Sequence, residues 1–72
     1  MLGKLKQLRK DIAQENKVPP YLIFNDATLV EMSNRVPTDN YQLLAINGVG
    51  QTKLSRYGKQ FIELIEQHLV SS

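Results

Sequence analysis

The short turn "NGVG", residues 47–50, has the glycine content of a phosphate-binding loop. Gly48 and Gly50 stand one residue apart, and a basic, helix-like run, "QTKLSRYGK", follows them. The phosphate-binding loop of an ATPase would require glycine at position 45 and lysine at position 51, where this chain has Ala45 and Gln51. The turn therefore offers no site for a nucleoside triphosphate.

Two interpretations of the turn stay open. The backbone N–H groups of Gly48 and Gly50 could lie at the N-terminus of the helix that follows, where the helix dipole favours an anion such as a nucleic-acid phosphate, as in the helix-hairpin-helix motifs that residues 47–50 resemble. Alternatively, Gly48 supplies a positive φ after the preceding helix while Val49 packs into the core. We favour the structural role and regard a phosphate contact as an addition to it.

Basic side chains form two groups. The first is a row of three lysines on the first expected helix, on the side opposite its apolar stripe: Lys6, Lys10 and Lys17. Asp11 and Glu15 lie beside the apolar stripe, and Arg9 lies between the stripe and the lysines. Such a lysine row is commonly only a solvated face, but here no acidic residue of the same helix neutralises it. The second group, Lys53 and Arg56 at i, i+3, follows the turn at residues 47–50.

Tyr21 follows two consecutive prolines, so it sits on a stiff, extended segment. An exposed ring on such a support could stack on an unpaired base. The alternative is that the ring helps to cover the core and leaves only its hydroxyl at the rim. The sequence alone favours burial.

The remaining side chains suggest no catalytic site, metal site or cofactor. His68 is the single histidine and the chain has no cysteine, so neither a thiolate metal site nor a disulfide can form. Asp26 and Asp39 are better explained as helix caps than as a catalytic pair. The net charge of +2 permits a polyanionic partner without requiring one. Because no apolar run is long enough to span a bilayer, we expect a cytoplasmic chain with no membrane partner.

The apolar periodicity predicts one all-α domain, residues 1–72, built as a compact bundle of about five short helices. The first helix runs from about Leu2 to Lys17, with Leu5, Leu8 and Ile12 inward, and residues 18–25 form an extended link. The second helix is capped by Asp26 and ends near residue 36, before a proline.

The second half of the chain continues the helical pattern. Asp39 caps a third helix, Gln42 completes a capping box, and the inward side chains are expected to be Leu43, Leu44 and Ile46. The fourth helix follows the turn at residues 47–50 until Gly58 interrupts it. The fifth restarts near Phe61 and reaches about residue 69.

Two stretches, "LRKDIAQENKVPPYLIFNDATLVEM" and "LLAINGVGQTKLSRYGKQFIELI", together resemble the HRDC (helicase and RNase D C-terminal) domain. The resemblance runs from about Leu5 to Leu69 and is greatest to the version at the end of bacterial RecQ-type DNA helicases. It implies a helical, auxiliary nucleic-acid-binding module, excised from the C-terminus of a larger helicase that carries a separate ATPase core. It also reverses the preference for Tyr21, since the aromatic of the matching "VPPY" segment belongs to a surface implicated in single-strand binding.

We therefore expect a non-catalytic, monomeric module that binds single-stranded or partly unwound DNA weakly and without sequence preference. The alternative is a protein-docking module that packs on the helicase core or on a partner protein through Tyr21, Ile23 and Tyr57. The residues expected to bind DNA are Tyr21, Lys17, Lys10, Lys6, Lys53, Arg56, Gly48 and Gly50.

Overall fold

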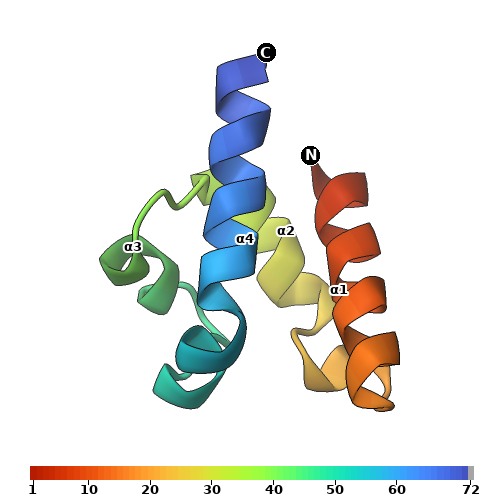
Figure 1. Cartoon of the computed structure of the whole chain (residues 1–72). Helices are drawn as coiled ribbons and strands as arrows, with labels where there is room; N and C mark the ends of the chain where they lie inside the picture. Colours follow the sequence, from red (N-terminus) through yellow and green to blue (C-terminus); the bar gives the residue numbers. More distant parts are fainter. Residues whose placement is uncertain (72) are drawn as a thin grey trace.

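The computed structural model describes residues 1–71, and within this range it is a bundle of α-helices without strands (Figure 1). The predicted all-α class is confirmed, and the expected number of about five helices is approximately right. The helical elements are α1 (Leu2–Asn16), the 3₁₀ turn η1 (Pro20–Leu22), α2 (Asp26–Arg35), α3 (Asn40–Leu44) and α4 (Gln51–Ser71).

The long helix α4 organises the bundle. It contacts α3 on one side and α1 on the other, while α1 also packs against α2 and η1. In Figure 1 both chain termini lie at one end of the molecule. The last turn of α1, η1 and the first turn of α4 lie toward the opposite end, so three of the expected DNA-binding segments share one end of the bundle. Among the described residues no helix is long and apolar enough to cross a membrane.

The core is centred on two phenylalanines from distant parts of the chain. The rings of Phe24 and Phe61 meet edge to face, with centroids 5.0 Å apart and an interplanar angle of 82°. Tyr57 also meets Phe24 edge to face, at 6.3 Å. The first-helix stripe behaves as predicted, since Leu5 and Ile12 are buried and Leu8 is half-buried. These contacts fix the segment that follows η1 against α4.

The end of α1 confirms one prediction and corrects another. The helix stops before the two prolines, with Lys17 in the left-handed region at φ 55° and Val18 N–H donating to Ala13 O at 3.0 Å. The expected extended link instead contains the 3₁₀ turn, in which Ile23 N–H donates to Pro20 O at 3.0 Å. A proline tolerates this position because the first residues of a helical turn need no N–H donor.

The N-cap of α2 is Asn25 and not Asp26. Asn25 Oδ1 accepts a hydrogen bond from the backbone N–H of Thr28 at 2.8 Å, and Asp26 is the first residue of the helix. The third-helix cap was predicted correctly, because Asp39 Oδ1 accepts from the N–H of Gln42 at 2.8 Å. The Gln42 side chain accepts from the N–H of Thr38, at 3.0 Å, so the capping box is displaced by one residue.

Two predictions about packing were wrong. Gly58 does not interrupt a helix, because α4 continues through it as one helix from residue 51 to residue 71. Gly58 is buried, and a Cβ there would lie 2.7 Å from Leu54 Cδ1 of the same helix, so this glycine leaves room for the Leu54 side chain beside Leu43 of α3, whose Cδ2 would be 3.5 Å away. Leu44, expected inward, is 40% exposed, since the next residue of so short a helix points away when Leu43 faces α4.

Candidate nucleic-acid interface

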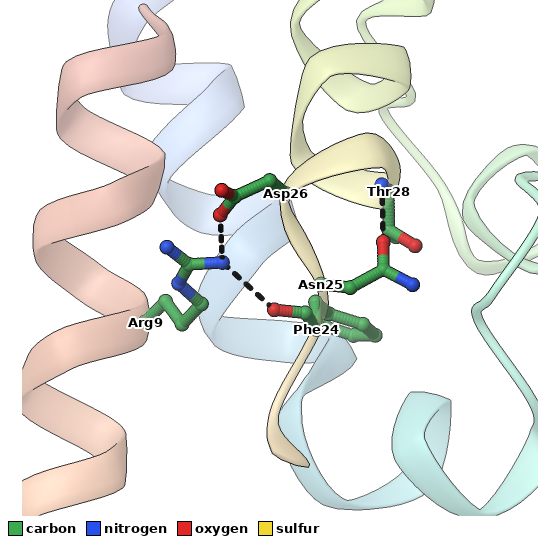
Figure 2. A network of polar contacts seen from close by, with 5 residues as sticks. All are labelled: Arg9, Phe24, Asn25, Asp26 and Thr28. Carbon is green, nitrogen blue, oxygen red and sulfur yellow. Dashed lines mark hydrogen bonds and ion pairs between the residues drawn. The ribbon is translucent and has the colours of Figure 1, made fainter. Parts of the chain in front are cut away.

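Arg9 ties α1 to the segment between η1 and α2 (Figure 2). Its Nη1 donates to the backbone carbonyl of Phe24 at 3.0 Å and forms an ion pair with Asp26 Oδ1 at 2.7 Å. The side chain is only 13% exposed, and its buried Nε has no hydrogen-bond partner within residues 1–71. Arg9 therefore belongs to the buried contact between α1 and the start of α2 and not to the lysine row. The sequence had left both roles open for this residue.

Asp26 interacts electrostatically with Lys6, the first lysine of the row. The pKa of its carboxyl is lowered mainly by the hydrogen bond from Arg9, then by the charge of Arg9, and to a smaller extent by the charge of Lys6. The row is thus partly balanced at Lys6 by a carboxylate from another helix. The expectation from α1 alone concerned only the acidic residues of that helix, and Asp26 belongs to α2.

The rest of the row is available to solvent. Lys10 and Lys17 are exposed, and neither forms an ion pair within the described part of the chain. Lys17 directly precedes the segment that leads into η1. Two unpaired ammonium groups are therefore held on α1 and at its end, where they are able to approach a polyanion.

Tyr21 stands out from the molecule at the middle of η1. It is 65% exposed, whereas Ile23 and Phe24, two and three residues later, are fully buried. The ring is therefore presented by a segment that is anchored in the core. This geometry favours the exposed interpretation of Tyr21. It also removes Ile23 from the docking surface that we considered as an alternative.

In the second basic group, Lys53 lies beside the buried ring of Phe24. Lys53 Nζ is 5.9 Å from the centroid of the Phe24 ring, within the range of a cation–π contact, and Lys53 is half-buried. Arg56 is exposed one turn later. Because Phe24 contacts Arg9 through its carbonyl and Lys53 through its ring, it links α1 to the start of α4.

The turn at residues 47–50 has a clear structural role. Thr28 Oγ1 donates to the carbonyl of Asn47 at 3.0 Å, and Gly48 has φ 95°. A Cβ at Gly48 would lie 2.2 Å from Thr28 Oγ1, so the close contact between α2 and the turn requires glycine. Val49 is buried, as the structural interpretation predicts.

Gly50 differs from Gly48 in each of these respects. A Cβ at Gly50 would meet nothing within 4 Å, and its φ is not positive. Its carbonyl accepts the N–H of Leu54 at 2.9 Å, so it immediately precedes the first turn of α4. Gly50 is thus an exposed backbone position directly before the helix that carries Lys53 and Arg56.

Comparison with known proteins identifies the family of this chain. A model of the HRDC domain matches residues 1–65. ATP-dependent DNA helicase RecQ of Haemophilus influenzae is 50% identical over 68 residues, which cover 94% of this chain and 11% of the relative. RecQ of Bacillus subtilis is 43% identical over 68 residues, 94% of this chain and 12% of the relative. The chain thus spans about a tenth of the length of these relatives.

The HRDC similarity extends beyond RecQ proteins. ATP-dependent DNA helicase UvrD2 of Mycobacterium tuberculosis is 40% identical over 65 residues, 90% of this chain and 9% of the relative. A solved structure of D. radiodurans RecQ HRDC domain 3 superposes with a TM-score of 0.91 at 25% identity and covers 94% of this chain and 90% of that one. Its fold is therefore the fold described above. With a family match over nearly the whole chain, the protein belongs to the HRDC domain family.

Proposed function

We propose that this domain is the accessory DNA-binding module of a RecQ-type ATP-dependent DNA helicase. The proposal is supported by the similarity to RecQ proteins, in which the matched region is a small part of a much longer helicase. ATP hydrolysis and strand separation would then belong to other parts of the parent protein, in agreement with the failed phosphate-loop match around Gly50. The domain would act as a monomer in the cytoplasm, where it would also meet the parent's helicase core.

The observation that carries the DNA-binding proposal is the exposed ring of Tyr21 on an anchored turn. Because Ile23 and Phe24 of the same segment are buried, little ordering of the chain is needed when an unpaired base stacks on the ring. Lys17 precedes this turn and Lys10 lies two helical turns before Lys17, so the phosphates of a strand that runs from the ring along α1 would meet both ammonium groups. Single-stranded or partly unwound DNA is the ligand that offers both an unpaired base and a run of phosphates.

The start of α4 would extend the contact. Lys53, held beside Phe24, and the exposed Arg56 supply further positive charge, and the N-terminus of α4 adds the favourable end of a helix dipole. The backbone of Gly50 would approach a phosphate more closely than that of Gly48, whose turn is held against Thr28. Lys6 would contribute less than Lys10, since it is partly balanced by Asp26.

These contacts predict weak and salt-dependent binding. Lysine recognises the phosphate backbone and reads no base edge, so the module should tolerate any sequence. With about four cations engaged, the logarithm of the binding constant should fall with the logarithm of the salt concentration with a slope of about −3 on single strands. The isolated domain should bind at about 10⁻⁴ to 10⁻⁶ M, and tethering to a helicase would raise the effective concentration enough to compensate.

Fluorescence anisotropy with a labelled thymidine oligonucleotide, titrated at several salt concentrations, tests the proposal. We expect saturable binding at low salt that weakens along the predicted slope. The absence of saturable binding at low salt would contradict a DNA-binding role and favour a purely protein-docking module. NMR titration of the same oligonucleotide should shift the amides of residues 17–22 and 50–56 first.

A further inference from the structure

The exposed surface around Tyr21 extends beyond the tyrosine ring. Pro19, Pro20, Tyr21 and Leu22 are four consecutive apolar residues, and all four are exposed. No other four successive apolar residues are exposed within residues 1–71. In natural proteins, runs of this kind mark contact sites, because apolar surface left in water is unfavourable. We name residues 19–22 the exposed apolar run.

The exposed apolar run has a fixed backbone. Leu22 N–H donates to the carbonyl of Pro19 at 3.0 Å, and Ile23 N–H donates to the carbonyl of Pro20 at 3.0 Å. Each proline also restricts its own φ, and the fully buried side chain of Ile23 holds the end of the turn in the core. The apolar side chains therefore stay at the surface, and a ligand would find them already in place.

The geometry of η1 separates Tyr21 from Leu22. A 3₁₀ turn has three residues per turn, so Pro20 lies on the same side as Ile23, toward the core. Tyr21 and Leu22 occupy the other two sides, about 120° apart. They are 65% and 47% exposed. The two side chains are thus directed away from one another, and they would contact different groups of a ligand.

The charges on either side of the exposed apolar run indicate the class of ligand. Lys17, two residues before it, is exposed and forms no ion pair among the described residues. Lys53 lies 5.9 Å from the ring of Phe24, two residues after it. Asp26, the first carboxylate after the run, is already paired with Arg9 at 2.7 Å. A single strand of nucleic acid, with apolar base faces bordered by phosphates, matches an apolar run bordered by cations.

We propose that Leu22 is a second base-contacting residue of this surface, an inference that rests on the function proposed above. While one unpaired base stacks on Tyr21, the base of the neighbouring nucleotide packs against the side chain of Leu22. The ligand is then a strand with two successive unstacked bases. A continuous duplex, whose bases cover one another, offers neither contact. Because Leu22 forms no hydrogen bond to a base edge, it adds affinity without selecting a sequence.

The test is fluorescence anisotropy at low salt with two labelled strands of equal length. One is octathymidine, and the other is an abasic chain in which tetrahydrofuran replaces each nucleoside, so that only the phosphate charges remain. Leu22→Ser should weaken binding to octathymidine about three- to tenfold and leave binding to the abasic chain unchanged. Leu22→Met, which keeps the apolar side chain, should bind as the parent does. The matched control is Leu44→Ser on α3, a leucine that is 40% exposed, and it should change neither affinity.

Methyl NMR of the parent domain supplies a measurement that needs no variant. Saturation with octathymidine should shift the δ-methyl resonances of Leu22 and give nuclear Overhauser effects to thymine protons. Two results would overturn this inference and leave the proposed function intact. The first is an equal loss by Leu22→Ser on both strands, which would show that Leu22 only supports the arrangement of the lysines. The second is unchanged Leu22 methyl resonances at saturation while Tyr21→Ala still weakens binding. No binding of octathymidine by the parent would instead refute the proposed function, and this inference with it.

Discussion

The guanidinium of Arg9 lies 2.7 Å from the carboxylate of Asp26 and holds, through the same Nη1, the carbonyl of Phe24 at 3.0 Å. Fifteen and seventeen residues separate these partners in the chain. One side chain thereby joins α1 to the segment that presents Tyr21 and to the first turn of α2. The exposed ring and the lysines of α1 are held in one arrangement through this contact.

Replacement of Arg9 by methionine should lower the free energy of unfolding by about 1 to 3 kcal/mol, since it leaves the carbonyl of the buried Phe24 without its donor. Urea denaturation monitored by circular dichroism measures this loss. Arg9→Lys is the matched control, because it keeps a charge and a donor but not the planar guanidinium, and its loss should be intermediate. An Arg9→Met variant as stable as the parent would show that the contact contributes nothing.

Acid should remove the contribution of the Asp26 ion pair. The pKa of Asp26 is lower in the folded chain, mainly through the hydrogen bond from Arg9, so its charged form stabilises the fold above the ordinary carboxyl range near pH 4. This stabilisation is lost as the pH falls through the lowered value. Thermal unfolding should therefore separate the parent from Asp26→Asn at pH 7 and show a smaller difference at pH 2.5. In an Arg9→Met background the same substitution should lose this pH dependence, and an unchanged dependence would assign it to another group.

The ring of Tyr21 should contribute stacking without supporting the fold. Tyr21→Ala should weaken binding to a thymidine oligonucleotide by about 1 to 3 kcal/mol, while the thermal midpoint changes little because the ring is exposed. Anisotropy titration and differential scanning fluorimetry measure the two effects. Tyr41→Ala is the matched control, an equally simple loss of an exposed ring, and should leave DNA affinity unchanged. A large fall in the midpoint of Tyr21→Ala would instead identify the ring as part of the core.

The sequence predicted most of the helices because their signals are local. Prolines end α1 and follow α2, and Asp39 caps α3 as expected. The missed features depend on contacts between distant segments. The conformational freedom of Gly58 predicts an interruption, but in the structure this glycine is buried within a continuous helix, where its missing Cβ leaves room for the side chain of Leu54.

The candidate site shows the same limit. The lysine positions on α1 and Tyr21 follow from helix geometry and from the family resemblance, and these side chains are exposed in the structure, whereas Lys53 is half-buried. The role of Arg9 was not recognised, because its partners are fifteen or more residues away. Asn25 offered a local signal, an asparagine three residues before Thr28, that the neighbouring aspartate obscured.

Loss of the lysines on α1 should reduce the salt dependence of DNA binding. Lys10→Ala combined with Lys17→Asn should flatten the slope by about 1.4, which is 0.7 for each phosphate contact on a single strand. Asparagine is chosen at position 17 because it tolerates the left-handed conformation of Lys17. Lys4→Ala is the control, since Lys4 lies on another side of α1, in a hollow with Leu64. An unchanged slope in the double variant would remove both lysines from the interface.

The two glycines of the 47–50 turn should respond differently to alanine. Gly48→Ala should lower the free energy of unfolding by at least about 1 to 2 kcal/mol, because φ 95° is unfavourable for alanine and its Cβ would meet Thr28 Oγ1. Gly50→Ala should change stability less, by up to about 1 kcal/mol, since nothing lies within 4 Å of the added atom but alanine is a poorer residue than glycine directly before a helix. This makes Gly50 the informative position for function. Weaker DNA binding by a fully stable Gly50→Ala variant would support a backbone contact with phosphate, and unchanged binding would leave the turn with its structural role alone.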